Sequence, residues 1–133
     1  LSVKGIAHPI VLRPETSDIN VFKQIFLSRD YECPSEPHAV AIAACYERTV
    51  ALGKTPLIID CGANIGLSAV WYANQYPKAV VIAVEPEPCN FAILQTNVAP
   101  YPNIRAVKKG ISDHAGHVCL SNVGGAPWAW QTT

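Results

Sequence analysis

Two acids and two glycines in this chain stand at spacings that suit the binding of a small ligand. Asp60 follows the apolar residues 57–59, and Gly62 and Gly66 come just after it, before a segment of helical character. Glu85 follows a second apolar run, residues 79–84. Open α/β folds bind ligands at the carboxyl ends of parallel strands, so the pattern predicts one strand–helix–strand unit with both acids at that edge.

The loop after Asp60 argues against a dinucleotide. A dinucleotide fingerprint has glycines at relative positions one, three and six, and here Gly62, Asn64 and Leu67 occupy them, so only the first fits. Asp60 would also place a negative charge near bound phosphates. A cationic ligand such as S-adenosylmethionine fits better, because a carboxylate about 4 Å from a positive charge gains roughly 4 kcal/mol at an effective dielectric near 20, before desolvation is subtracted.

Glu85 is placed to accept hydrogen bonds from two ribose hydroxyls. Nicotinamide dinucleotides and S-adenosylmethionine both offer such hydroxyls, so this acid does not choose between them. Two alternatives to a methyltransferase therefore stay open. One is a nicotinamide-dependent oxidoreductase half-domain, and the other is a non-catalytic binding or assembly module that keeps the fold.

A set of motifs spread over residues 8–131 resembles the FkbM family of S-adenosylmethionine-dependent methyltransferases. These motifs are DCGANIG at 60–66, VEPEP at 84–88, Asn90-Phe91, Leu94, Asn97-Val98, GISD at 110–113 with Gly116, and upstream LRPETSD at 12–18 with Val21-Phe22 and QIF at 24–26.

The resemblance implies a Rossmann-like class I methyltransferase fold that converts S-adenosylmethionine to S-adenosylhomocysteine. It implies that Asp60, Gly62 and Gly66 line the methionine end of the cofactor, that Glu85 holds the ribose, and that Ser112 or Asp113 lies near the adenine. The acceptor would be a hydroxyl of a small molecule, saccharide or lipid. The predicted cofactor-binding residues are Asp60, Gly62, Ala63, Asn64, Gly66, Glu85, Pro86, Ser112 and Asp113. No general base is assigned.

The elements expected around these motifs form an α/β fold. The core is predicted as strand 57–61, helix 65–76, strand 79–85, helix 88–98 and strand 104–109, and right-handed crossovers give the strand order 3-2-1 with both helices on one face. Residues 1–56 are expected to form an amino-terminal strand and helical segment before the methyltransferase portion, 57–133. That segment holds a strand at 9–13, a helix that begins at Thr16–Asp18 and packs Ile19, Phe22 and Phe26 on one face, and a helix at 38–52 capped by Gly53. Residues 117–121 are expected in a hairpin extension.

The family's domain continues past the Ser-Asp segment into further strands. We therefore expect the chain to be the amino-terminal portion of a truncated domain, with the general base beyond residue 133, weak cofactor binding and no activity of its own. In strand order 3-2-1 the apolar strand 57–61 lies at an edge, and an uncovered apolar edge favours pairing, so self-association through it is expected.

The composition of the chain restricts which classes of molecule it is expected to bind. The chain has 133 residues and formal net charge +0, which gives no electrostatic footprint for nucleic acid. Its apolar runs are strand-sized and too short to span a membrane, so a cytoplasmic location is expected. Five cysteines form no Cys-x-x-Cys pair and are expected to be free thiols. Asp113, His114 and His117 are close in sequence but offer too few ligands to predict a metal site.

Overall fold

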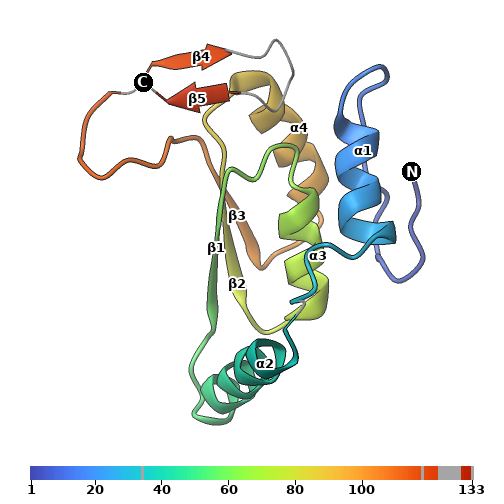
Figure 1. The fold of residues 1–133 in the computed structure, drawn as a ribbon, viewed down its shortest axis with the longest axis vertical. Helices are drawn as coiled ribbons and strands as arrows, with labels where there is room; N and C mark the ends of the chain where they lie inside the picture. The colour runs from blue at the N-terminus through green and yellow to red at the C-terminus, as the bar shows by residue number, and fades with distance from the viewer. Residues whose placement is uncertain (34, 118, 123–129, 133) are drawn as a thin grey trace.

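The computed structural model describes residues 1–33, 35–117, 119–122 and 130–132. In chain order its elements are α1 (Asp18–Phe22), the π-helix η1 (Lys23–Leu27), α2 (Glu36–Ala51), β1 (Leu57–Cys61), α3 (Leu67–Gln75), β2 (Val80–Val84), α4 (Pro88–Val98), β3 (Ile104–Val107), β4 (Leu120–Asn122) and β5 (Trp130–Thr132), shown in Figure 1.

A parallel sheet in the order β1-β2-β3 positions the two acids. The register pairs Asp60 with Ala83, so β1 and β2 end side by side. Both α3 and α4 cover the same face of this sheet (Figure 1), as right-handed crossovers require. The predicted α/β class, the parallel pairing and the strand order 3-2-1 are confirmed.

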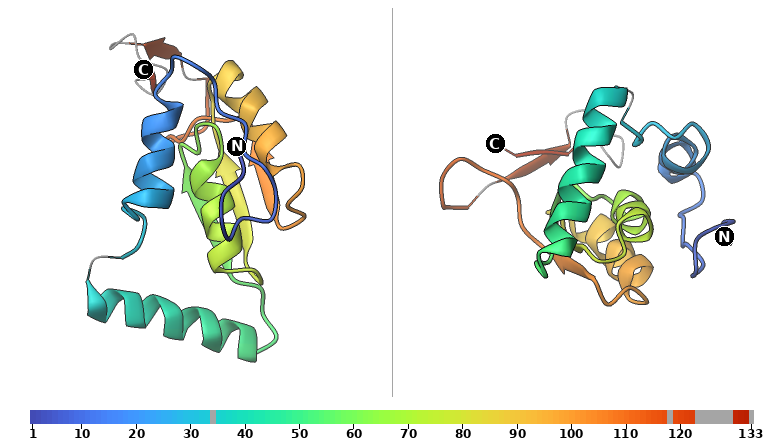
Figure 2. Two further views of the ribbon diagram at one scale, coloured as in Figure 1. Left: turned by 90° about the vertical axis from the view of Figure 1, so that its right-hand side faces the viewer. Right: turned by 90° about the horizontal axis from the view of Figure 1, so that it is seen from below.

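The molecule has three layers: the sheet, then α3 with α4, then the amino-terminal segment with α1 (Figure 2). Ile65, Leu67, Val70, Val81 and Leu94 are buried where the sheet meets its helices. The same core includes Ile10, Phe22 and Ile25 from the outer layer. The division of the chain at residue 56 remains a prediction.

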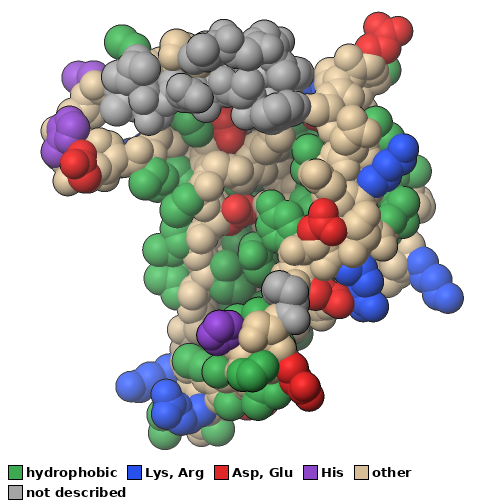
Figure 3. Space-filling view, in the orientation of Figure 1, with side chains coloured by type: hydrophobic (Ala, Val, Ile, Leu, Met, Phe, Trp, Pro, Cys, Tyr) green, Lys and Arg blue, Asp and Glu red, His purple; other side chains and the backbone are tan. Residues whose placement is uncertain are grey.

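The opposite face of the sheet is open around β1. Exposure alternates along this strand, and Leu57 and Ile59 are 61% and 58% exposed. Hydrophobic side chains accordingly gather along this side of the molecule (Figure 3). Within the described residues β1 pairs only with β2, so it is the edge strand, as expected. Self-association through this edge remains a prediction.

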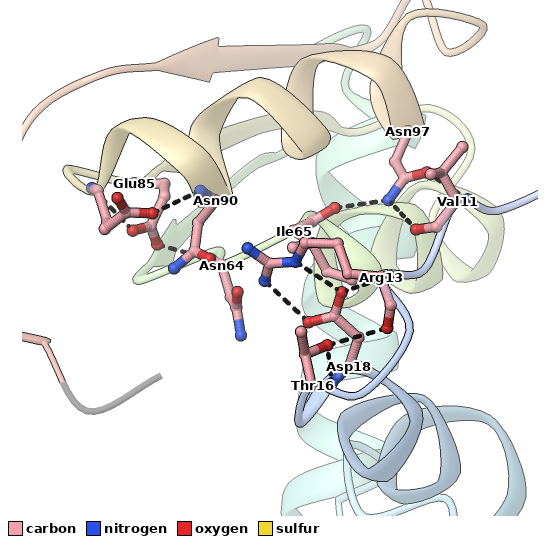
Figure 4. A network of polar contacts seen from close by, with 10 residues as sticks. Val11, Arg13, Thr16, Asp18, Asn64, Ile65, Glu85, Asn90 and Asn97 are labelled. Atoms are coloured by element: carbon pink, nitrogen blue, oxygen red, sulfur yellow. Dashed lines mark hydrogen bonds and ion pairs between the residues drawn. The ribbon is translucent and has the colours of Figure 1, made fainter. Parts of the chain in front are cut away.

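The predicted strand at 9–13 is wrong. This segment contacts α4, and none of the strands in the described part of the chain pairs with it. Instead the side chain of Asn97 on α4 satisfies Val11: Asn97 Oδ1 accepts from Val11 N at 2.7 Å, and Asn97 Nδ2 donates to Val11 O at 3.0 Å. A buried amide thus replaces the neighbouring peptide of a sheet (Figure 4).

The predicted helix after Thr16 is correct in place, and Phe22 and Phe26 pack in or against the core as expected, but Ile19 does not. Ile19 is 45% exposed, whereas Asp18, Phe22 and Ile25 are buried. Asp18 can occupy a core position because Arg13 neutralises it: Arg13 Nε and NH2 donate to the two carboxylate oxygens at 3.0 and 2.9 Å. Burial alone would raise the pKa of Asp18, but the hydrogen bonds from Arg13 hold it below its usual value.

The other boundaries shift by a few residues. The helix expected at 38–52 is Glu36–Ala51, and Gly53 follows it at φ +68°, the left-handed conformation expected of a cap. The third core strand ends at Val107 rather than at residue 109. Part of the segment 117–121 forms β4, which pairs antiparallel with β5, so the hairpin is confirmed with different bounds. The five cysteines are free.

Candidate functional site

The loop between β1 and α3 is tied to the end of β2. Backbone N–H groups of Gly62 and Ala63 both donate to Val84 O, each at 2.9 Å. Gly62 adopts φ +92°, and a Cβ placed on it would meet no atom within 4 Å. The backbone at Gly62 therefore borders open space, in a conformation that favours glycine.

Asp60 stands half-buried at the carboxyl end of β1, where Ser68 Oγ donates to its Oδ2 at 2.6 Å. Burial raises the pKa of Asp60 although the Ser68 bond lowers it, which means that the ionised carboxylate is under-solvated. Burial, followed by the charge of Asp60, also raises the pKa values of Tyr31 and Tyr72. A cationic ligand group here would replace solvation that Asp60 has lost.

Glu85 braces the same loop from the end of β2. Its Oε2 accepts from the backbone N of Asn64 at 2.8 Å, and its Oε1 accepts from the backbone N of Glu87 at 2.9 Å. Asn64 itself adopts a left-handed φ of 51°, and its backbone N–H reaches Glu85 (Figure 4). Each carboxylate oxygen can accept a further hydrogen bond, so Glu85 keeps capacity for a ligand hydroxyl. Pro86 lies between Glu85 and Glu87 in the chain.

Gly66 faces α4 rather than open space. At φ +88°, a Cβ on Gly66 would lie 2.6 Å from Leu94 Cδ1 and 3.2 Å from Val98 Cγ1. Asn97 Nδ2 fixes the same turn by donating to Ile65 O at 2.8 Å. The second glycine of the motif thus permits close packing of the α3 start against α4, while the first borders the open side of the loop.

Ser112 and Asp113 are exposed in the segment after β3. Their hydrogen bonds are local, from Ser112 Oγ to Asp113 Oδ1 at 3.4 Å and from His114 N to Ser112 Oγ at 3.4 Å. This segment extends away from α4 (Figure 1). The structure therefore brings together Asp60, the 62–66 loop and Glu85, but not Ser112 and Asp113.

A cavity of about 470 Å³ opens between the loop and the α1–η1 helix. The loop side is lined by Gly62, Ala63, Asn64 and Ser68, and the helix side carries polar residues that sequence reasoning missed: Ser17, Asn20 and Gln24. Their signal was present, because positions i, i+3 and i+7 share a helix face.

Tyr31 joins this cavity to a second one. It also lines a cavity of about 720 Å³ between α2 and α3, together with Tyr46, Trp71, Tyr72 and Tyr76. Tyr31 contacts Trp71 and Tyr72 edge-on, with ring centroids 6.3 and 6.1 Å apart. The cavity at the loop, whose lining mixes polar and apolar residues, therefore borders an aromatic one.

In the part of the chain that the structure describes, no cluster of three or more His, Cys, Asp or Glu could hold a metal ion. None of the described helices combines the length and apolar character that crossing a membrane requires.

Two methyltransferases resemble the chain over part of its length. Methyltransferase sdnD of Sordaria araneosa is 35% identical over 80 residues, which are 58% of this chain and 30% of that protein. Methyltransferase 1 of Beauveria bassiana is 30% identical over 59 residues, 44% of this chain and 23% of that protein. No family model matches, so the likeness to the FkbM family remains a resemblance. With the parallel sheet and its loop, these partial similarities support a methyltransferase.

Proposed function

We propose that this chain supplies the cofactor-binding portion of an S-adenosylmethionine-dependent methyltransferase. The observation that carries the proposal is the placement of two acids, Asp60 and Glu85, at adjacent strand ends next to one glycine loop. The backbone N–H of Asn64 reaches Glu85 Oε2 at 2.8 Å, while Asp60, at the end of β1, accepts from Ser68 Oγ at 2.6 Å. One acid suits a cation and the other suits a pair of hydroxyls.

The residues present fit this cofactor. Asp60 would face its positive charges, Gly62, Ala63 and Asn64 would border it with backbone, and Glu85 would accept from its ribose. Gly66 would act through packing. The adenine contact of Ser112 and Asp113 requires the segment after β3 to approach the loop, and it remains a prediction.

When bound, the cofactor supplies an activated methyl group that an acceptor oxygen can take from sulfur by direct displacement. The chain's own contribution is alignment, which lowers a barrier by roughly 7–11 kcal/mol in favourable cases. Burial, followed by the charge of Asp60, raises the pKa values of Tyr31 and Tyr72, which favours the protonated form of both hydroxyls. The acceptor is a hydroxyl of a small molecule, saccharide or lipid. A cytoplasmic location belongs to the same proposal.

Calorimetric titration with S-adenosylhomocysteine and with NAD tests the proposal against an oxidoreductase half-domain. We expect the first ligand to bind and the second not to, because Leu67 is buried where a dinucleotide loop needs its third glycine. Binding of NAD alone would reject the proposal. A non-catalytic module that keeps the fold is separated from an enzyme by a methyl-transfer assay and not by this titration.

Asp60→Asn tests the electrostatic part. It should weaken S-adenosylhomocysteine binding about tenfold or more, since a hydrogen bond to a charged group is worth roughly 1.5–3 kcal/mol. Because the pKa of Asp60 is raised in the folded chain, its ionisation opposes folding. The ligand-free chain should thus lose stability relative to Asp60→Asn as the pH rises above the usual aspartate range. Unchanged affinity would remove Asp60 from the site.

A further inference from the structure

The helix α2 stands apart from the layers that form the core. It lies beyond the amino-terminal ends of β1 and β2 (Figure 1), and none of its described residues is buried. Tyr46 ties it to the body: its Oη accepts from Lys78 N at 3.2 Å, and its ring centroid lies 5.1 Å from that of Tyr76. Protein interiors are close-packed, so a helix held off in this way leaves a cavity in place of a packed core.

That cavity, of about 720 Å³, is called here the aromatic cavity. Its walls come from one face of α2, from β1 and from α3, and include Ile42 and Tyr46, Ile58, and Trp71 and Tyr72 respectively. Sites for small molecules usually enclose about 300–1,000 Å³ and are lined mainly by apolar and aromatic side chains. The aromatic cavity has both properties.

The chemistry of this lining suits a neutral and mainly apolar molecule. Among the described residues that line the cavity there is no Lys, Arg or Asp, and the carboxylate of Glu32 is paired with Arg29 at 2.7 Å. A saccharide would place most of its hydroxyls against apolar walls, and a polar group buried without a partner is unfavourable. The lining therefore favours an apolar ring system over a polyhydroxylated one.

The aromatic cavity adjoins the proposed cofactor site. Tyr31 lines both this cavity and the one at the glycine loop. Ile58 and Asp60 lie on the same face of β1, because side chains two positions apart do so, and they are roughly 7 Å apart along the strand. Burial and then the charge of Asp60 raise the pKa values of Tyr31 and Tyr72, which agrees with rings that lie near this carboxylate.

We propose that the aromatic cavity binds the methyl acceptor, and that this acceptor is a neutral, mainly apolar ring compound that carries a hydroxyl. The inference rests on the proposed function and narrows its acceptor to one chemical class. The ring system lies against Trp71 and Tyr72, and the hydroxyl points past Tyr31 toward the glycine loop. In this arrangement α2 supplies the outer wall of the acceptor site.

Two tryptophan substitutions on α2 test the site. Ile42 lines the cavity, whereas Val40 is exposed on the same helix and is not among the lining residues. In equilibrium dialysis we expect the unsubstituted chain to bind two neutral ring alcohols, β-estradiol and 2-naphthol, in preference to methyl β-glucoside. Ile42→Trp fills the cavity and should weaken alcohol binding about tenfold or more, while Val40→Trp should change it by less than about twofold.

Calorimetric titration with S-adenosylhomocysteine separates the two sites. Neither Ile42 nor Val40 lines the loop cavity, so both tryptophan variants should bind this ligand as the unsubstituted chain does. Tyr31→Ala should weaken the alcohols and S-adenosylhomocysteine together, because Tyr31 lines both cavities. Urea unfolding checks that each variant keeps the fold.

Each contrary outcome has a distinct meaning. Preference for the glucoside, or binding of neither alcohol, would overturn the apolar class. Alcohol binding that Ile42→Trp leaves unchanged would overturn the aromatic cavity as its site, and a Tyr31→Ala effect on the alcohols alone would overturn its connection to the loop. These results leave the proposed function standing. Failure of the unsubstituted chain to bind S-adenosylhomocysteine would overturn the proposed function, and with it the assignment of a bound alcohol as the acceptor.

Discussion

Replacing Gly66 by alanine should destabilise the fold through a specific contact with α4. The new Cβ would lie 2.6 Å from Leu94 Cδ1 and 3.2 Å from Val98 Cγ1, and Gly66 adopts φ +88°. Leu94 is fully buried, so it has little room to move away. The substitution therefore adds steric overlap to backbone strain.

The magnitude follows from the two contributions. A left-handed conformation costs a non-glycine residue about 1–2 kcal/mol, and overpacking a filled core costs about 1–3 kcal/mol. Gly66→Ala should thus lower the free energy of unfolding by roughly 2–5 kcal/mol, a large part of the ~5–15 kcal/mol typical of a domain.

Gly62→Ala is the matched control, because Gly62 has φ +92° but open space around its Cβ position. It should lower the free energy of unfolding by only the backbone share, about 1–2 kcal/mol. Urea unfolding followed by far-ultraviolet circular dichroism measures both values, and Gly66→Ala should lower the midpoint by roughly 1–2 M.

A double variant isolates the contact. Leu94→Ala alone should cost about 2–5 kcal/mol, but it also removes the atom nearest the new Cβ, so Gly66→Ala in that background should cost about 1–3 kcal/mol less than in the wild type. Equal destabilisation by the two glycine substitutions, together with strict additivity in the double variant, would refute the packing role of Gly66.

Two further predictions concern the tethers of the amino-terminal segment. In urea unfolding, Asp18→Asn should lower the free energy of unfolding by about 2–4 kcal/mol, because it leaves Arg13 without its fully buried carboxylate partner. The control Glu32→Gln breaks an exposed ion pair and should lower it by under about 0.5 kcal/mol. Equal losses of stability would show that burial of the ion pair does not matter. Because the pKa of Asp18 is lowered, its stabilisation is full above the usual aspartate pKa and should fade as the pH falls through the lowered value, a dependence that Asp18→Asn should lack. In urea unfolding, Asn97→Ala should lower the free energy of unfolding by about 2–4 kcal/mol and Asn103→Ala by about 1 kcal/mol, because the Asn97 side chain makes the three hydrogen bonds described above and the Asn103 side chain makes one. Asn97→Ala should also weaken S-adenosylhomocysteine binding. A loss of stability no larger than that of Asn103→Ala would contradict the tethering role.

Local sequence determined the central part of this molecule. The runs 57–61, 79–85 and 104–109 predicted three parallel strands in the order 3-2-1, because crossover handedness leaves few arrangements. The same rule placed Asp60 and Glu85 at adjacent strand ends. Gly53 was predictable as a left-handed cap, since a helix end is a local feature.

Tertiary packing decided what spacing could not. Residues 9–13 are apolar enough for a strand, but both backbone hydrogen bonds of Val11 go to the side chain of Asn97, 86 residues away in sequence. Ile19 is more hydrophobic than Asp18, yet Asp18 is buried because the Arg13 fork compensates its charge. The two glycines of the loop read alike in sequence, and only the approach of α4 separates packing at Gly66 from open space at Gly62.

The strand order and the position of Asp60 and Glu85 at adjacent strand ends follow from residue patterns, because both depend on periodicity and on the handedness of the crossovers. Only the tertiary structure set the cavity wall of Ser17, Asn20 and Gln24 against the loop, since that contact depends on how the outer layer docks on α3 and α4. Docking is a long-range outcome of buried surface and side-chain hydrogen bonds, which residue spacing does not encode.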